Sequence, residues 1–554
     1  MLAATPMTPL SEAKRTARLA EWFTAGILTV FIIYAHVRVW QHAGPLWRDE
    51  ISSLRVATMP TLAGFWSSLV YDPFPAIFFG LLRVWHWLGW GSSDQGLRVL
   101  GLVIGLAILG AIWMAAWMIR RSPPSWALVL FGLSPVALVW GDSLRAYGLS
   151  CVCNVLAIGL IWRLLGEAPN TRKILLTTLV AILSVHSAFP NAFFLFAAGG
   201  SAIVVSIRRQ QWRTVRVIVG IGAFTAFSLL IYTPIIRESQ TWTGLAKGAI
   251  NTAWIFKMIL NVIQGGGNIA VALWIGGAFV AFLAFWVGLI KPRRVPLTEK
   301  EKDLFLYAGM TFLVALILIV SFFRVVGWKT SIWYYVPLMA TAAICIDTIA
   351  GALRKNSAAV IVSSALLLIT AIPLGRIAVT ATSTRLTNVD LVAEEIGRYA
   401  ERSDLIVVDN YFYAISFNRY YHGRAPWIFA PGLEDLSLHR WDLLINSMRK
   451  SRPIQPLLEQ IDQTLKAGHH VFVVGYAPTT RLPSSPPDLP PAPKSSSGWS
   501  LWPYMSTWTG QIAYDAQLRA SKGMIISVPC RQNVNIAECI NAFVVSGWRD
   551  ETGG

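Results

Sequence analysis

Charged residues are scarce in this sequence. Asp, Glu, Lys and Arg make up 14% of its 554 residues, whereas hydrophobic residues make up 55% and the mean hydropathy is +0.52. Soluble domains carry about 25% charged residues, so this composition excludes a soluble globular protein. It predicts a polytopic membrane protein, most of which lies in a lipid bilayer.

Acidic residues are the scarcer of the two signs of charge, with 29 Asp and Glu against 47 Lys and Arg and a net charge of +18. The basic residues lie in short clusters between apolar runs, and no basic stripe carries exposed aromatic residues, so we expect no nucleic-acid partner. Clusters of this kind are typical of cytoplasmic loops. The first of them, Lys14, Arg15 and Arg18, precedes an apolar run without a cleavage pattern, which indicates an uncleaved first span.

Cysteine is also scarce, with five residues in the chain. Cys151, Cys153 and Cys345 lie inside apolar runs, where cysteine acts as a small apolar residue. Cys530 and Cys539 lie in the polar tail. If this tail faces an oxidising compartment, these two cysteines form a disulfide, and two free thiols are the alternative.

Eleven apolar runs approach the roughly 20 residues that a membrane-spanning helix needs. They lie near residues 22–40, 98–119, 125–140, 144–162, 174–186, 188–207, 215–236, 269–290, 304–323, 332–352 and 358–377. The run at 125–140 is short and must include flanking residues to span. The sequence therefore predicts about 11 transmembrane helices.

A twelfth apolar stretch, residues 76–90, decides which side the C-terminus lies on. It is short, and Arg83 and His86 share one helical face, so we expect an interfacial helix rather than a span. With eleven spans and the N-terminus inside, short inner loops hold 16 Lys and Arg residues, and the longer outer connections hold nine. The positive-inside rule supports this orientation and places the first loop, 42–97, outside.

Beyond residue 380 the long apolar runs give way to charges, prolines and shorter patterns. Residues 403–409 and 470–475 read as buried strands, residues 434–467 between them as helical, and the Pro- and Ser-rich run 482–497 as an extended loop. We therefore expect two domains. Residues 1–380 form the transmembrane domain, and residues 381–554 form a soluble α/β domain on the periplasmic side.

Polar motifs gather where the predicted spans end on the outer side. The first loop carries Leu46-Trp47-Arg48-Asp49-Glu50 and later Asp72-Pro73, and Ser134-Pro135 leads into Asp142-Ser143-Leu144-Arg145-Ala146-Tyr147. These motifs resemble those of the C-type (GT-C fold) integral-membrane glycosyltransferases, in particular bacterial relatives of the protein O-mannosyltransferases and of the lipid A aminoarabinose transferase. The resemblance covers residues 20–200 by motif and the remaining chain by layout.

The resemblance implies roles for specific residues. In that class an acidic residue of the first outer loop acts at the glycosyl-transfer centre, which here is Asp49 with Glu50 beside it. Asp142 matches the second acidic position, and Arg145 with Tyr147 matches an Arg-x-Tyr pattern. The class usually has Arg-Tyr before the proline of span ten, where this chain has Trp333-Tyr334-Tyr335-Val336-Pro337. The other substrate-binding residues that we expect are Asp72, Arg83, His186, Arg324, Lys329 and Tyr335, with Lys329 or Arg324 at the phosphate.

Structural roles are the alternatives at several of these positions. Asp49 and Glu50 can be solvated loop charges, and Asp142 can pair with Arg145 to close a tight turn. His186 is better explained as a histidine at a span end whose hydrogen bonds are satisfied than as a ligand. Asp72 before a proline is a good turn former.

The residues and the resemblance together predict an inverting glycosyltransferase of the bacterial inner membrane. It moves a hexosyl or pentosyl group from a polyprenyl-phosphate-linked donor to a periplasmic lipid, polysaccharide or protein acceptor. A carboxylate takes the acceptor proton, and cations stabilise the leaving phosphate. No metal-ligand spacing occurs, although Asp49 and Glu50 leave room for a divalent metal. The alternatives are a transporter or flippase of a lipid-linked substrate, and a non-catalytic scaffold.

Overall fold

The computed structural model describes residues 12–72, 74–166, 169–242, 245, 250–290, 297–409, 411–475, 484–494, 498–528, 530 and 532–549, and every structural statement below refers to these. Some sequence features discussed above lie outside the described residues. They are Pro73 of the Asp72-Pro73 motif, Lys247 among the nine outer cations, Lys291, Arg293 and Arg294 among the 16 inner cations, and both ends of the Pro- and Ser-rich run.

A bundle of long apolar helices makes up most of the described chain. Nine helical segments are long and apolar enough to cross a membrane. They are α1 (Glu12–His42), α5 (Asp94–Arg120), α8 (Ala146–Gly166), α10 (Asn191–Arg208), α11 (Trp212–Ser228) extended by η3 (Leu229–Tyr232) and α12 (Thr233–Ser239), α14 (Gly267–Ile290), α15 (Glu299–Val326), η5 (Ile332–Tyr335) with α16 (Val336–Leu353), and α17 (Ser357–Thr382). The protein is therefore a multi-pass membrane protein.

The other two predicted spans are helical but short. One is α9 (Thr171–Ser187), with 17 residues. The other is broken into α6 (Ser125–Ala127), the π-helical segment η2 (Leu128–Gly132) and α7 (Pro135–Gly141). The break has a local cause, because Ser134 accepts a hydrogen bond from the Ala137 amide and Pro135 suits the first position of a new helix.

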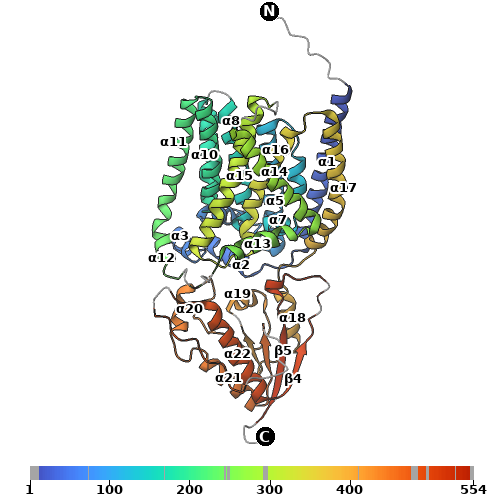
Figure 1. Ribbon diagram of the computed structural model, residues 1–554. Helices are drawn as coiled ribbons and strands as arrows, with labels where there is room; N and C mark the ends of the chain where they lie inside the picture. Colours follow the sequence, from blue (N-terminus) through green and yellow to red (C-terminus); the bar gives the residue numbers. More distant parts are fainter. Residues whose placement is uncertain are drawn as a thin grey trace, which may run out of the picture.

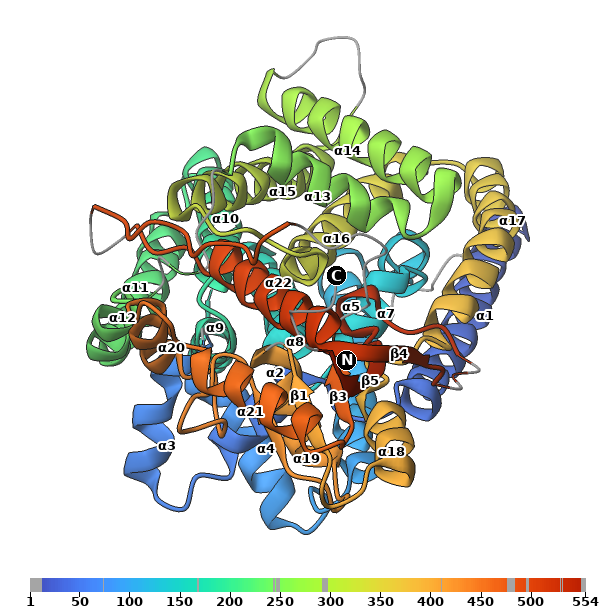
Figure 2. The same ribbon diagram turned by 90° about the horizontal axis from the view of Figure 1, so that it is seen from below.

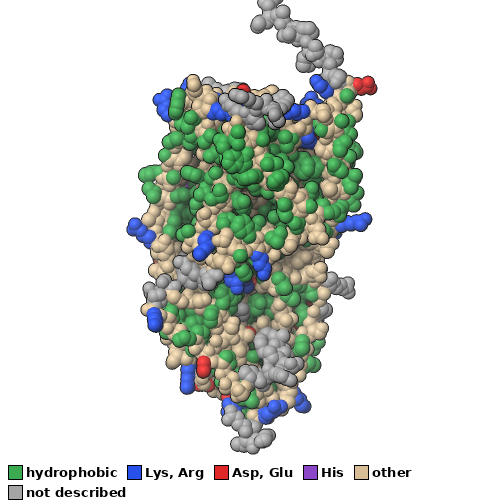
Figure 3. Space-filling view, in the orientation of Figure 1, with side chains coloured by type: hydrophobic (Ala, Val, Ile, Leu, Met, Phe, Trp, Pro, Cys, Tyr) green, Lys and Arg blue, Asp and Glu red, His purple; other side chains and the backbone are tan. Residues whose placement is uncertain are grey.

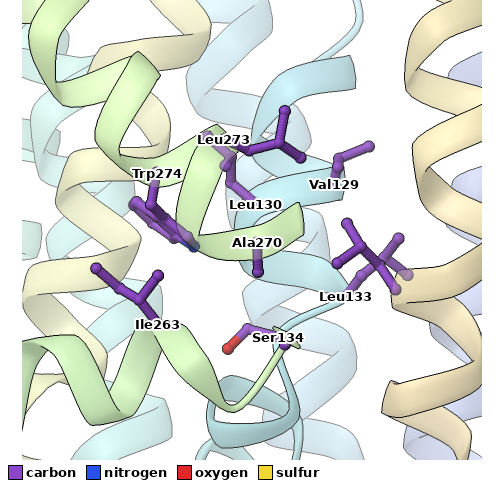
Figure 4. A pocket seen from close by; sticks show the side chains of 10 residues that line it. Val129, Leu130, Leu133, Ser134, Ile263, Ala270, Leu273 and Trp274 are labelled. Carbon is purple, nitrogen blue, oxygen red and sulfur yellow. The ribbon is translucent and has the colours of Figure 1, made fainter. Parts of the chain in front are cut away.

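An apolar crevice lies beside this break, between η2, α14 and the short helix α13 (Thr252–Gln264) (Figure 4). Of the residues that line it, Ser134 and Trp274 carry polar side-chain groups. Its volume is about 10 Å³, which is room for about one water molecule. This crevice is a packing defect at the π-helix and is too small for a lipid chain or a sugar.

The two ends of the bundle differ. The N-terminal end of α1 lies at one end, and the sheet-containing part of the chain covers the other (Figure 1). This arrangement requires that the chain pass from one end of the bundle to the other an odd number of times. Hydrophobic side chains cover the flank of the bundle, and Lys and Arg gather near its rims (Figure 3). This distribution fits a bilayer around the helices.

Short helices line the end of the bundle that faces the sheet. Between α1 and α5 lie α2 (Arg48–Ala57), α3 (Leu62–Ser68), η1 (Leu69–Tyr71) and α4 (Ala76–Trp87). The stretch expected to be an interfacial helix is helical and forms α4. The Trp-Arg-Asp-Glu motif, which we expected in a loop, instead begins α2.

The chain after α17 contains a five-stranded mixed sheet in the order β2-β1-β3-β5-β4. The strands are β1 (Leu405–Val408), β2 (Trp427–Phe429), β3 (Val471–Val474), β4 (Ala520–Ile526) and β5 (Ala542–Trp548); β2 and β3 run parallel to β1, and β5 runs antiparallel to β3 and β4. The helices are α18 (Val389–Tyr399), α19 (Tyr411–Tyr420), α20 (Trp441–Met448), α21 (Gln455–Lys466), α22 (Leu501–Arg519) and η6 (Ile536–Glu538). Both predicted strands are confirmed as β1 and β3, each fully buried.

The single helical region expected over 434–467 is wrong in detail, because it divides into α20 and α21. The intervening Ser451-Arg452-Pro453 is unfavourable for a continuous helix, since proline disfavours the helical conformation of the residue before it. The described part of the Pro- and Ser-rich run, 484–494, has no helix or strand. It packs along α22, where Gln511 donates to the Pro487 carbonyl oxygen at 2.8 Å.

The cysteines are free thiols in the structure, including Cys530 and Cys539, so the expected disulfide is not formed. The Cys530 thiol instead donates to the Gln532 carbonyl oxygen at 3.1 Å. Cys539 lies beyond η6 and is exposed.

Candidate active site

The first turn of α2 carries the acidic pair. Trp47 is the N-cap residue, and its amide donates to Glu50 Oε2 at 3.2 Å. A helix N-terminus stabilises negative charge, so Asp49 and Glu50 stand where acidic residues favour the helix. The helix points the two neighbouring side chains in different directions, and their environments differ accordingly.

Asp49 keeps an accessible carboxylate, with 22% of its side chain exposed. Its Oδ1 lies 3.5 Å from Arg48 Nε and 3.4 Å from His439 Nε2. Burial raises the pKa of this carboxyl, but the hydrogen bond with His439 and the positive charges of two nearby arginines outweigh burial and hold the pKa well below its usual range. Asp49 is therefore ionised at neutral pH and reachable from outside, so it is not simply a solvated loop charge.

Glu50 is fully buried and engaged on both oxygens. Arg98 Nη1 of α5 lies 2.6 Å from its Oε1, which also accepts a hydrogen bond from the Leu144 amide at 2.8 Å. Glu50 thus ties α2 to the start of α5 and to the turn before α8. We expected Glu50 beside Asp49 at the reaction centre, but this geometry gives it a positioning role.

Asp72 and Arg145 form the second ion pair of the site. Arg145 Nη1 lies 2.6 Å from Asp72 Oδ2, and Nη2 lies 3.1 Å from Oδ1, a two-bond arrangement that fixes both side chains. The same Nη1 also donates to the Asp49 carbonyl oxygen and to Ser53 Oγ. Arg145 therefore holds the backbone of Asp49 in place, and the ring of Phe74 lies beneath its guanidinium at 4.8 Å.

Asp142 pairs with His36 of α1, not with Arg145. Its two carboxylate oxygens each lie 2.9 Å from His36 Nδ1, and both side chains are buried. Gly105 of α5 allows this contact, because a Cβ there would lie 2.2 Å from Asp142 Oδ1. The alternative in which Asp142 and Arg145 close the turn together is wrong, and Asp142 instead fastens the turn to α1 and α5.

Two residues of the sheet-containing part reach the acidic turn. His439 is 5% exposed and stacks on Trp441, with ring centroids 5.3 Å apart. Glu538 is fully buried, and its Oε1 lies 2.9 Å from Arg48 Nη1. Sequence reasoning missed both, because His439 falls in a stretch read as helix and Glu538 in an unassigned tail.

Burial raises the pKa of Glu538 to about 7, with Arg48 lowering it and Asp49 raising it further. Arg48 thus stands between two carboxylates, one accessible and one buried. Asp49 lies at the seam between the helical bundle and the sheet-containing part.

Several contacts hold this seam together. The Leu46 amide donates to Tyr420 Oη at 2.7 Å, and Tyr420 Oη donates to Asp94 Oδ2 at 2.6 Å. On the other side, Trp441 Nε1 donates to the Tyr71 carbonyl oxygen at 3.1 Å. Helix α19 packs on α2, and the view from below shows the sheet-containing part over α2 (Figure 2). Hydrogen bonds therefore hold the acidic turn on both sides.

Four other expected site residues have partners that give them structural roles. Arg83 Nη1 donates to the carbonyl oxygens of Ala57 and Met59, at 2.8 and 2.7 Å. His186 contacts Tyr232 Oη and Ser228 Oγ, both at 3.0 Å, so it is a satisfied histidine. The remaining two are buried aromatics: Tyr335 bonds Thr330 Oγ1, and Tyr147 packs edge-on to Phe74.

The two cations expected at the phosphate are exposed: Arg324 lies in the last turn of α15, and Lys329 follows that helix. Lys329 Nζ lies 5.6 Å from the ring centroids of both Trp254 of α13 and Trp502 of α22. Trp328 packs against Tyr334, which lies close enough to Asp49 to interact electrostatically. Arg324 and Lys329 make no ion pair with a described carboxylate. Lys329 thus stands at the same seam as Asp49.

No group of three or more His, Cys, Asp or Glu residues suited to a metal ion occurs in the part of the chain that the structure describes.

No family model matches this chain, and no curated protein matches it. Among solved structures, it is similar to ArnT from Cupriavidus metallidurans bound to undecaprenyl phosphate, at 12% identity and a TM-score of 0.47, over 81% of this chain and 93% of that chain. It is also similar to the oligosaccharyltransferase of Archaeoglobus fulgidus, at 11% identity and a TM-score of 0.45, over 80% of this chain and 67% of that chain. Both are glycosyltransferases of the GT-C fold. The likeness concerns the fold.

Proposed function

We propose that this protein is an inverting glycosyltransferase that uses a polyprenyl-phosphate-linked sugar as donor. The observation that carries the proposal is the Asp49 carboxylate. It is ionised, accessible and set among fixed cations at the seam between a membrane bundle and an extramembrane domain. At that seam a donor from the bilayer can meet an acceptor from water.

In the proposed reaction the acceptor hydroxyl oxygen attacks the anomeric carbon, and the bond from that carbon to the phosphate oxygen breaks. The hydroxyl proton passes to Asp49, and the electron pair of the broken bond leaves with the polyprenyl phosphate. The low pKa of Asp49 makes it a weak base, which suits transfer of the proton late in the attack, when the hydroxyl has become more acidic.

The leaving phosphate develops negative charge and needs a cation. Arg145 has a structural role in this proposal, because its Nη atoms already donate hydrogen bonds to Asp72, Ser53 and the Asp49 backbone. Lys329 is exposed and belongs to the segment that leads to Tyr334. We therefore assign the phosphate to Lys329, with the two indoles beside it as walls. The positive-inside pattern supports a periplasmic position for this site.

Replacing Asp49 by Asn tests the proposal. With purified protein in bilayers and a polyprenyl-phosphate sugar as donor, we expect D49N to slow transfer by roughly 10²- to 10⁴-fold, and the matched exposed-surface variant D488N to keep wild-type rates. Wild-type turnover by D49N would remove Asp49 from the chemistry. Movement of the lipid-linked substrate across the bilayer by wild type and D49N alike, without transfer, would favour a flippase.

His439→Phe tests the contribution of the extramembrane domain, with the exposed His422→Phe as its control. H439F removes a hydrogen bond that lowers the pKa of Asp49, so that pKa rises. We expect a rate reduced by about tenfold to 100-fold and an acidic limb of the pH–rate profile displaced to higher pH. A variant that loses rate without displacing this limb would show that His439 only packs the seam.

A further inference from the structure

A basic crevice opens at the end of the bundle opposite the sheet, far from Asp49. Its volume is about 680 Å³, which falls in the range of ligand sites. It lies among the ends of α5, α8, α9, α10 and α15. The residues that line it are Met118, Ile119, Arg121, Trp162, Arg163, Gly166, Lys173, Arg208, Arg209, Glu299, Lys300 and Asp303.

The charges on this lining are unbalanced. Six basic residues face two acidic ones, which leaves a net charge of +4. The buried Asp303 is already engaged by Arg209, whose Nε lies 2.7 Å from its Oδ2, and Glu299 is engaged by Arg208 Nη2 at 2.8 Å. The acidic residues therefore position cations and leave an excess of positive charge toward the opening.

The two inner arginines are held by the ends of neighbouring helices. Arg208 Nη1 donates to the Gly288 carbonyl oxygen of α14 at 3.0 Å, and Arg209 Nη1 donates to the Leu165 carbonyl oxygen of α8 at 2.6 Å. These bonds neutralise helix C-termini that would otherwise repel an anion. The inner wall is thus fixed before any ligand arrives.

The outer cations are exposed. Arg163 and Lys300 make no ion pair with the described carboxylates, and Arg121 lies over the Trp117 ring with its guanidinium 5.9 Å from the centroid. The lining also has an apolar wall, formed by Met118, Ile119 and Trp162. Cations and an apolar wall in one hollow at the ends of membrane spans match a molecule with a phosphate and an acyl chain.

We propose that this crevice binds an anionic phospholipid through its phosphodiester. Positive charge alone is expected on the inner side of any membrane protein. A hollow of this size with anchored arginines and an apolar wall is more than that pattern requires, and basic hollows between spans on that side are suited to anionic headgroups. A soluble phosphate shares the headgroup chemistry but makes no use of the apolar wall.

The test compares two double variants of the full-length protein that each remove two cations from the same end of the bundle. R163Q/K300Q alters the crevice, and R213Q/R216Q alters the exposed start of α11, which does not line it. Delipidated proteins are titrated with phosphatidylglycerol or phosphatidylcholine, and retained lipid is counted by native mass spectrometry. We expect wild type and R213Q/R216Q to prefer phosphatidylglycerol, and R163Q/K300Q to bind it on the order of tenfold more weakly.

Equal losses in both double variants would overturn the proposal, because they would show a diffuse surface effect. Glycerol phosphate at millimolar concentration provides the second arm. If it displaces phosphatidylglycerol completely, the crevice is a site for soluble anions and the proposal fails. Retention of the lipid against this competitor supports it, and neither result bears on Asp49.

Discussion

Asp49 and Glu50 are neighbours in sequence with opposite environments. Asp49 keeps 22% of its side chain exposed, whereas Glu50 is fully buried against Arg98. A reacting carboxylate must be reached by its substrate, and a buried ion pair cannot open without leaving a charge unpaired. The proposed chemical role therefore belongs to Asp49, and the proposed positioning role belongs to Glu50.

Glu50→Gln tests this separation. The substitution leaves the buried Arg98 guanidinium without its counter-ion, and such a loss costs about 3–5 kcal/mol. We expect the unfolding temperature of E50Q in detergent to fall clearly, and that of D49N to fall less, because Asp49 is partly exposed and leaves no fully buried charge unpaired. If E50Q unfolds like wild type and only loses turnover, Glu50 acts in the chemistry and not through position.

At the scale of elements, α2 is a ten-residue helix held at both ends. Glu50 accepts the Trp47 amide at its start, and Arg83 of α4 caps the carbonyl oxygens of Ala57 and Met59 at its end. Cations near a helix C-terminus interact favourably with its last carbonyls. Arg83 therefore keeps α2, and with it Asp49, fixed against α4.

Arg83→Gln separates this role from the substrate binding expected from the sequence. We expect R83Q to lower the free energy of unfolding by about 1–2 kcal/mol, as lost charge-assisted hydrogen bonds do, with the KM for the donor unchanged. Arg55→Gln on the exposed face of α2 is the matched control and changes neither quantity. A raised donor KM at unchanged stability would return Arg83 to the substrate.

Elements with strong local patterns could be predicted. The long apolar runs predicted the spans, and the short apolar runs predicted β1 and β3, because periodicity and length are enough to identify such elements. The break at η2 and the division of 434–467 depend on proline and on packing between distant helices. Helix α2 was missed because its sequence is polar at the start and its stability comes from Arg83, Arg98 and α19.

At the scale of the whole molecule, the candidate site forms where distant segments meet. Asp49 and Arg145 could be nominated from motifs that end predicted spans. His439 and Glu538 could not, since no spacing in one sequence shows which loop of the sheet-containing part lies over α2. Both parts of the chain are therefore required for the site.

The pH dependence of stability in the variant Glu538→Gln tests this contact between the two parts of the chain. Burial raises the pKa of Glu538 to about 7, whereas the unfolded chain has an ordinary value near 4.3. Between these two values the folded state keeps a proton that the unfolded state releases, so stability falls as pH rises from about 4.5 to 7 and then levels. The loss of unfolding free energy across this window amounts to about 4 kcal/mol at most.

We therefore expect the unfolding temperature of wild type to decrease across this window, and that of E538Q to change less, because the amide does not titrate. Glu434→Gln, on the exposed surface, should keep the wild-type slope. If E538Q and wild type share one pH profile, Glu538 does not titrate there. Arg48, which pairs with both Glu538 and Asp49, would then not transmit the titration of Glu538 to the acidic turn, and His439 would remain as a contact of the sheet-containing part with Asp49.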